Sequence, residues 1–238
     1  MNALEVRDLV KDYGRFRAVK GVSFDVRKGE VFGLIGPNGA GKTTVLRTIA
    51  TILQISSGLV TVFDYGLPRE AGQVRKIISY LPEEAGAYKN LTGRQYLTFI
   101  ARFFGDGDSQ QSMLARGLEI AGLGERVDDR VDTYSKGMTR RLLVGRALMT
   151  DPKLAILDEP TSGLDVINAQ VVRKIITRSV EAGVTVLLSS HNMLEVEFLC
   201  DRIALIDDGR VVATGTAAEL RREYGAANIE EAFVKAIT

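Results

Sequence analysis

The sequence predicts an α/β fold with a mostly parallel core sheet, an N-terminal antiparallel β layer and an inserted helical subdomain. Apolar runs of strand length, such as Val31–Ile35 and Val184–Leu188, alternate with segments of helical periodicity. A parallel sheet flanked by helices is the usual packing for that alternation. The alternation is interrupted between residues 85 and 150, where only helical patterns occur. We therefore expect one domain, 1–238, with a helical insertion at 85–150 and a short C-terminal extension at 208–238.

Length and composition are those of an ordinary globular domain and exclude several classes of site. The 238 residues are 45% hydrophobic and 26% charged, which is close to the average for globular proteins. A net charge of +1 argues against a nucleic-acid binder, since such domains usually carry a concentrated basic excess. The single cysteine, Cys200, excludes an intrachain disulfide. Together with the single histidine, His191, it also excludes a zinc site built from His and Cys.

Neither a signal peptide nor a membrane span is expected. The first ten residues alternate charged and apolar positions, without the basic-then-apolar order of a signal peptide. No apolar run approaches the roughly 18 residues that a spanning helix needs. We expect a soluble chain that acts at a membrane only through another chain.

The elements before the insertion follow from alternation and from glycine-containing turns. Tyr13-Gly14 and Lys28-Gly29 break an alternating N-terminal region into short strands of an antiparallel layer. A buried strand, a Gly-rich loop and a helix come next. The expected strands are 4–7, 18–19, 22–26, 31–35, 59–63 and 77–81, and the expected helix runs from about residue 42 to 53.

Helical periodicity dominates the insertion, and strand–helix alternation returns after Pro152. Leu97, Ile100, Ala101 and Phe104 have the spacing of residues that share one helix face. Further helices are expected at 109–122 and 135–149. The later part predicts strands at 154–157, 184–188 and 203–206, helices at 166–182 and 192–200, and two short helices at 219–225 and 228–233.

Residues 36–43, GPNGAGKT, match the phosphate-loop pattern G-x-x-x-x-G-K-[ST] in full. The glycines allow backbone amides to turn inward and cradle phosphates at a helix N-terminus. Lys42 would reach the β- and γ-phosphates, and the Thr43 hydroxyl would ligate Mg²⁺. An ordinary Gly-rich turn is the alternative, but the Lys-Thr pair and both flanking elements favour the phosphate loop. The expected nucleotide-binding residues here are Gly36, Asn38, Gly39, Gly41, Lys42, Thr43 and Thr44.

Two carboxylates end the apolar strand that precedes Pro160. Ligands of parallel sheets bind at the C-terminal edge of the strands, so Asp158 and Glu159 are expected to face the phosphate loop. We assign Asp158 to Mg²⁺ and Glu159 to the attacking water as general base. Without a phosphate loop earlier in the chain, a strand that ends in Asp-Glu-Pro would be interpreted as leading into a solvated turn.

Three further motifs occur downstream of or beside these two. They are Tyr134–Met138 at the start of a helix, Ser162–Asp165 just after Glu159, and His191 after an apolar strand. The order and spacing of all five motifs resembles the ATP-binding subunits of ABC transporters over essentially the whole chain. The resemblance implies ATP and Mg²⁺ as cofactors. It also implies a homodimer or heterodimer of cassettes, a separate transmembrane permease, and a cytoplasmic location on the inner face of the membrane.

The same resemblance implies roles for individual residues. Tyr13 would stack on adenine, and His191 would contact the γ-phosphate and position the water. Ser135 and Gly137, in the signature motif, would contact the γ-phosphate bound to the opposite subunit, and Asp165 would link the two sites. From the residues alone, Ser135 and Asp165 are helix N-caps, and we expect each to serve in both ways.

The chain departs from the family pattern at two places. Lys136 and Met138 stand where the signature usually has Gly and Gln, as in the bacterial drug- and sodium-efflux group. Glu83 stands where a Gln normally follows the proline at position 82. This carboxylate is expected to meet Mg²⁺ or its water, with a solvated acidic turn as the open alternative.

The resemblance also implies a partner surface and a function. In the family, the insertion faces the transmembrane subunit, so residues near 85–96, with Tyr88, Lys89 and Arg94, would receive a short cytoplasmic helix of the permease. We expect an ATPase subunit that powers an exporter. The alternative is an ABC ATPase without a permease, but neither a second cassette nor a long coiled coil is visible. A scaffold without turnover is disfavoured because all the expected catalytic residues are present.

Overall fold

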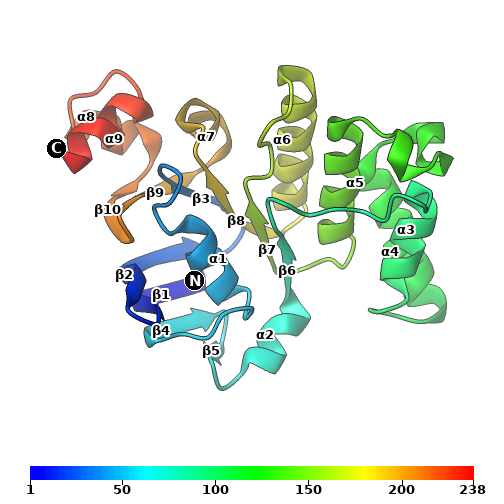
Figure 1. The fold of residues 1–238 in the computed structure, drawn as a ribbon, viewed down its shortest axis with the longest axis horizontal. Helices are drawn as coiled ribbons and strands as arrows, with labels where there is room; N and C mark the ends of the chain where they lie inside the picture. The colour runs from blue at the N-terminus through cyan, green and yellow to red at the C-terminus, as the bar shows by residue number, and fades with distance from the viewer.

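The computed structural model describes residues 1–193 and 196–238 in full, and residues 194 and 195 only as part of a helix. It has two sheets and a group of helices set to one side of them (Figure 1). One sheet is antiparallel and has the strand order β2-β1-β4-β5, whereas the other has the order β10-β9-β3-β8-β7-β6. The predicted α/β class is therefore confirmed, together with its N-terminal antiparallel layer.

The antiparallel sheet is built around one long hairpin. The expected strands at 18–19 and 22–26 are wrong as separate elements, because a single strand spans them. Gly21, with φ of +94°, lies in a bulge where the pairing shifts, so the ladder continues through the glycine. The strands are β1 (Asn2–Tyr13), β2 (Phe16–Arg27), β4 (Ser57–Val62) and β5 (Tyr65–Leu67).

The six-stranded sheet is parallel except for β10, which pairs antiparallel with β9. Every residue of β3, β7 and β8 is buried, which explains why these strands are continuous apolar runs. The first part of the expected 208–238 extension is the edge strand β10 of this sheet. The strands are β3 (Val31–Ile35), β6 (Ile78–Leu81), β7 (Leu154–Asp158), β8 (Thr185–Ser190), β9 (Arg202–Asp207) and β10 (Arg210–Gly215).

Helices outside the insertion cover the sheets, and two of them form the C-terminal end of the chain. Helix α1 follows β3 directly and contacts β2, β7 and β8, so it lies between the two sheets. It ends four residues earlier than expected. None of the helices in the described part of the chain has the length and hydropathy to cross a membrane. These helices are α1 (Lys42–Ile49), α2 (Ala71–Ile77), α6 (Val166–Glu181), α7 (Met193–Leu199), α8 (Ala217–Glu223) and α9 (Ile229–Ile237).

The helical part contains three α-helices and two short 3₁₀ turns. Leu97 and Ala101 of α3 are buried and Ile100 is partly buried, as the periodicity predicts, and Tyr96 is buried as well. Phe104 was expected on the same face, and this is wrong: α3 ends at Ala101, and the Phe104 side chain is 61% exposed. The elements are α3 (Gly93–Ala101), α4 (Gly107–Ala121), the turns Gly124–Asp128 and Val131–Thr133, and α5 (Lys136–Leu148).

The helical part shares a hydrophobic core with one face of the large sheet. Leu142 and Leu143 of α5 belong to the same buried cluster as Leu157 of β7 and Val186 of β8. The start of α5 is thereby held close to the C-terminal edge of the sheet, where β3, β7 and β8 end.

Candidate functional site

The loop between β3 and α1 requires glycine at two positions. A Cβ atom at Gly36 would lie 2.0 Å from the carbonyl oxygen of Ile206. Gly41 has φ of +99°, and a Cβ there would lie 2.8 Å from the carbonyl oxygen of Ala18. Gly41 is also the N-cap of α1 and provides no side chain to cap the first amides. These amides, with no acidic residue in the first turn, make the helix start an anion-binding site.

A cavity of about 470 Å³ opens above this loop. Tyr13 lines it from the end of β1, and the Lys11 ammonium lies 5.4 Å from the Tyr13 ring centre. Phe16, which the sequence reasoning missed, lines the same cavity and is the cross-strand partner of Tyr13. The sequence signal that could have indicated Phe16 was an aromatic residue just after the Tyr13-Gly14 turn. The cavity is lined by Tyr13, Phe16, Ala18, Pro37, Asn38, Gly39, Gly41, Lys42, Thr43, Thr44, Glu83 and Glu159.

Lys42 is buried at the floor of this cavity. Its Nζ donates hydrogen bonds to the carbonyl oxygens of Gly36 (2.7 Å) and Pro37 (3.1 Å). It also lies 3.6 Å from Oε1 of Glu159. Burial lowers the pKa of Lys42, and the negative charges of Glu159 and Asp158 act in the opposite direction. The ammonium is thus held between the phosphate loop and the carboxylates that follow β7.

Asp158, at the end of β7, is completely buried and accepts hydrogen bonds from three hydroxyl groups. The donors are Ser189 (2.6 Å), Thr43 (3.2 Å) and Tyr80 (3.3 Å). Ser189 also accepts a hydrogen bond from the amide of Glu159 (3.0 Å). Sequence reasoning missed Ser189 and Tyr80. Their signal was positional, because both lie near the C-terminal ends of strands that neighbour β7.

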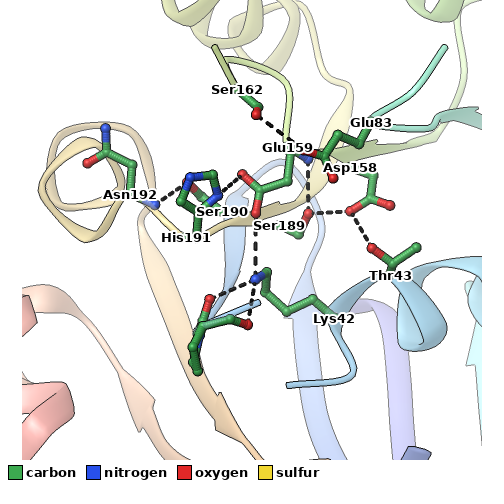
Figure 2. Close-up of polar contacts among 12 residues, drawn as sticks. Lys42, Thr43, Glu83, Asp158, Glu159, Ser162, Ser189, Ser190, His191 and Asn192 are labelled. Atoms are coloured by element: carbon green, nitrogen blue, oxygen red, sulfur yellow. Dashed lines mark hydrogen bonds and ion pairs between the residues drawn. The ribbon is translucent and has the colours of Figure 1, made fainter. Parts of the chain in front are cut away.

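Glu159 lies between Lys42 and His191 (Figure 2). Its Oε2 is 2.9 Å from Nδ1 of His191, whose side chain is 46% exposed at the end of β8. Its Oε1 is buried and accepts no hydrogen bond from any described residue. The backbone of Glu159 has φ of +48°, an unfavourable conformation for this residue type that is typical of functional sites. One carboxylate oxygen is therefore held by His191, whereas the other makes no hydrogen bond with the described residues and lies 3.6 Å from the Lys42 ammonium.

Glu83 lies on the loop after β6 and connects two motifs. Its Oε1 accepts a hydrogen bond from the Ser162 hydroxyl at 3.2 Å. The exposed Glu83 side chain lines the cavity above the phosphate loop and a second cavity beside Lys136 and Ser162. The geometry places Glu83 beside the cavity above the phosphate loop, and its carboxylate accepts a hydrogen bond from Ser162.

The starts of α5 and α6 lie together. Ser135 caps α5 by accepting from the amide of Met138 (3.2 Å), and Asp165 caps α6 by accepting from the amide of Asn168 (2.9 Å). Both predicted N-caps are confirmed. Hydrogen bonds from the backbone amide and from the side chain of Asn168 lower the pKa of Asp165. A Cβ at Gly137 would lie 2.2 Å from the Asn168 side chain, so only glycine permits this approach.

The expected site residues thus form two groups. Most line the phosphate-loop cavity, and Gly36, Asp158 and His191 contact residues that line it. Ser135, Gly137 and Asp165 are not among the described residues that line this cavity. They belong to the outward-facing group at the starts of α5 and α6.

Comparison with known proteins finds consistent similarity. A family model described as ABC transporter matches residues 19–162. The linearmycin resistance ATP-binding protein LnrL of Bacillus subtilis is 40% identical over 244 residues, covering 98% of this chain and 78% of that protein. The daunorubicin/doxorubicin resistance ATP-binding protein DrrA of Streptomyces peucetius is 41% identical over 226 residues, covering 94% and 68%.

One solved structure, described as the ATP binding subunit of an ABC transporter, has a TM-score of 0.87 to this chain. It is 30% identical and covers 99% of this chain and 100% of its own. A second family model, an imidazolonepropionase-like composite domain of bacteria, matches only residues 205–227, too short a segment to show a family.

Proposed function

The chain belongs to the ABC transporter family of ATPases, and we propose that it is the subunit whose ATP binding and hydrolysis drive an exporter. The observation that carries the catalytic part is the placement of Glu159. One of its oxygens is held by His191 at 2.9 Å, and the other is buried, without a hydrogen bond, and 3.6 Å from Lys42. A carboxylate in this position can accept a proton beside a bound phosphate.

The chemistry follows from these contacts. A water oxygen bonds to the γ-phosphorus while the bond to the β–γ bridging oxygen breaks, and ADP leaves with the electron pair. The water proton passes to Oε1 of Glu159, which acts as general base. Lys42 and the amides at the start of α1 stabilise the negative charge on the phosphate oxygens. His191 holds Glu159 in place and reaches the γ-phosphate from the other side.

The residues near the phosphate loop fit Mg²⁺. The Thr43 hydroxyl and the Asp158 carboxylate lie 3.2 Å apart and offer hard oxygen ligands. No cluster of three or more His, Cys, Asp or Glu side chains in the described residues could hold a metal by itself. That agrees with Mg²⁺ held by one or two carboxylates and the substrate phosphates, where it would neutralise phosphate charge. We assign Thr43 and Asp158 as ligands and Glu83 as a further candidate.

Dimerisation would complete the site. Ser135 and Gly137 lie at the start of α5, outside the cavity of their own phosphate loop. A helix N-terminus of this kind suits a phosphate group. We propose that two cassettes, identical or different, pair head to tail so that these residues meet the nucleotide of the partner and Asp165 lies between the two sites. Tyr13 would stack on the adenine.

An exposed aromatic surface supports a permease partner. The rings of Tyr88 and Phe99, and of Phe99 and Phe103, meet edge to face at 5.6 and 5.0 Å. Tyr88 is 55% and Phe103 is 70% exposed. Beside them lies a cavity of about 330 Å³ that Arg94 and Arg102 also line. An apolar surface edged by arginines suits a short amphipathic helix with acidic residues.

The names of two relatives support export as the direction of transport. LnrL and DrrA are named as resistance ATP-binding proteins, and a resistance protein that uses ATP is most simply part of an exporter. We therefore propose that the chain works at the cytoplasmic face of the membrane, bound to a permease encoded separately. It needs no nucleic-acid partner.

The decisive experiment is Glu159→Gln, measured by phosphate release and by gel filtration with ATP and Mg²⁺. We expect loss of turnover and a stable ATP-bound dimer, because binding is retained while the base is removed. Glu84→Gln, at an exposed neighbour of Glu83, is the control and should turn over normally. Normal turnover of Glu159→Gln would remove Glu159 from the role of base.

The permease is tested separately, by pull-down of the wild-type chain from detergent-solubilised membranes. Recovery of a multi-spanning membrane protein in stoichiometric amount is expected. Recovery of ribosomes or DNA repair proteins instead would favour an ABC ATPase that acts without a permease.

A further inference from the structure

Arg140 is a buried arginine on α5 to which the chemistry above gives no role. Its guanidinium donates hydrogen bonds to three consecutive backbone carbonyls, those of the last residue of β7 and of the two residues that follow it. Nε donates to Pro160 (2.7 Å), and Nη2 donates to Asp158 (3.0 Å) and Glu159. The side chain is only 7% exposed, so water does not compete for these bonds. The peptide units on both sides of the catalytic carboxylate are therefore tied to one side chain.

The same guanidinium also binds the loop after β6. Nη1 of Arg140 donates to the carbonyls of Glu83 (3.1 Å) and Pro82 (3.4 Å). The two loops meet again where the Ser162 hydroxyl bonds to the Glu83 carboxylate. Arg140 thus connects the segments that carry Glu83 and Glu159, which are far apart in the sequence.

Only arginine can make this set of bonds. Its planar group directs five N–H donors outward from one rigid fork, whereas lysine has a single nitrogen on a flexible stem. Among the described residues, its five acceptors are all backbone carbonyls and none is a carboxylate. Burial lowers the pKa of Arg140, and the charges of Glu83, Asp158 and Glu159 act in the opposite direction. The buried guanidinium of Arg140 therefore serves to orient the backbone carbonyls around it.

The conformation of Glu159 is what this orientation maintains. Its φ of +48° is unfavourable for a residue with a side chain and persists only when neighbouring contacts enforce it. Arg140 donates to the carbonyls of residues 158, 159 and 160 at the same time, so another backbone conformation of Glu159 would break some of these hydrogen bonds. It also lies one helical turn after Gly137, so the start of α5 is joined directly to these loops.

We propose that Arg140 is a positioning residue for hydrolysis: it holds the loops after β6 and β7 so that Glu159 directs Oε1, the oxygen without a hydrogen bond from the described residues, to the attacking water. The inference rests on the proposed function, in which Glu159 is the base. It predicts that Arg140 acts on turnover and not on ATP binding, since its described hydrogen bonds do not involve the phosphate loop.

Arg140→Lys is the first test, because it keeps the charge and loses the fork. We expect kcat for ATP to fall roughly 10- to 100-fold, as small misplacements of catalytic groups do. Affinity for a fluorescent ATP analogue should stay within about twofold, since Lys42 and Tyr13 are untouched. A kcat within about twofold of wild type would overturn the inference.

A double-mutant cycle with Glu159→Gln separates positioning from a general structural role. If Arg140 acts through Glu159, the double variant should turn over no more slowly than Glu159→Gln alone. Multiplied losses in the double variant would overturn the inference. Normal turnover of Glu159→Gln would contradict the proposed function as well, whereas an inactive Glu159→Gln with a fully active Arg140→Lys would contradict only the role of Arg140.

Arg141→Lys is the matched control, on the same helix and with the same substitution. Arg141 donates to the carbonyl of Gly122 at 3.4 Å, within the helical part, and should leave kcat unchanged. If Arg140→Lys does not fold by circular dichroism, the same cycle is measured on Arg140→Gln. Equal loss of kcat in the variants at 140 and 141 would also overturn the inference.

Discussion

The phosphate-loop cavity and the start of α5 differ in how their polar groups are satisfied. Around the cavity, Lys42 and Asp158 are buried: Asp158 accepts hydrogen bonds from distant parts of the chain, and Lys42 binds its own loop and lies 3.6 Å from Glu159. At the starts of α5 and α6, Ser135 and Asp165 make local capping bonds on the surface. The first region is prepared for a ligand by its own chain. The second is a helix N-terminus at the surface, and this contrast is one reason why we propose a site shared between two chains.

The glycines of the two regions make the same point. Gly36 and Gly41 allow the loop to approach backbone carbonyls of other strands, which sets the cavity. Gly137 allows α5 to approach Asn168, which sets the two helix starts side by side. Each region is therefore shaped by close packing within one chain, and in the proposed dimer the two regions would meet across the interface.

Removing Lys42 should have the largest effect. Lys42→Ala deletes the cation 3.6 Å from Glu159 and the charge that stabilises the phosphates. We expect turnover to fall by about 10³-fold or more, as for loss of a main electrostatic group at a catalytic site. Phosphate release is the measurement, and Lys174→Ala, at an exposed position of α6, should stay active. Substantial turnover of Lys42→Ala would show that the cavity is not the hydrolytic site.

Mixing two inactive variants tests whether the site is shared. Lys42→Ala damages the first region, and Ser135→Arg blocks the second. A mixed dimer of the two contains one intact composite site, so random pairing should restore about a quarter of wild-type turnover. Phosphate release from the mixture, against each variant alone, is the measurement. No recovery in a mixture shown to contain mixed dimers would place the whole site in one chain.

His191→Ala should have an intermediate effect. The imidazole lies 2.9 Å from Glu159 and holds one of its oxygens. Its loss should lower kcat roughly 10²-fold, the size of one general-base or orienting contribution, and leave ATP binding intact. Single-turnover hydrolysis measures the loss of rate, and a parallel binding assay measures the affinity for ATP. Weaker binding at unchanged kcat would instead make His191 a binding residue only.

The aromatic surface should affect transport more than basal hydrolysis. Phe103→Ala, Tyr88→Ala or Arg94→Glu should weaken permease co-purification and ATP-driven transport, with ATPase activity of the isolated chain within about twofold of wild type. Arg94 pairs with Asp128, so Asp128→Asn is the control for loss of that ion pair alone. Unchanged co-purification and transport in the three variants would contradict the proposed permease surface.

The smallest effect concerns the two helix caps. Asp165→Ala should lower the melting temperature at neutral pH, because its hydrogen bonds from Asn168 hold the pKa of Asp165 below its usual value. A lowered pKa means that this stabilisation is present at neutral pH and lost as pH falls through the folded-state pKa. The difference in melting temperature between Asp165→Ala and the wild type should therefore disappear at acid pH. Ser135→Ala should cost about 1 kcal/mol at every pH, since serine does not ionise. A gap for Asp165→Ala that does not change with pH would show that its charge is not involved.

Local patterns in the sequence predicted the phosphate loop, the carboxylates at 158 and 159, and the helix caps at Ser135 and Asp165. These features depend on residues within a few positions of one another, such as a glycine before a helix or a serine at its start. The continuous apolar runs predicted the buried parallel strands for the same reason. Phe104 was misplaced because periodicity alone does not say where a helix ends.

Only the tertiary structure decided which distant groups meet. Ser189 reaches Asp158 because β7 and β8 pair in parallel with those residues in register. Arg140 reaches the loops after β6 and β7 because the apolar side of α5 packs on the same core as the large sheet. Neither contact leaves a local signature, since hydrogen bonds between elements depend on how buried apolar faces dock. The sequence by itself determined the candidate catalytic residues, and packing of the core determined how they are held.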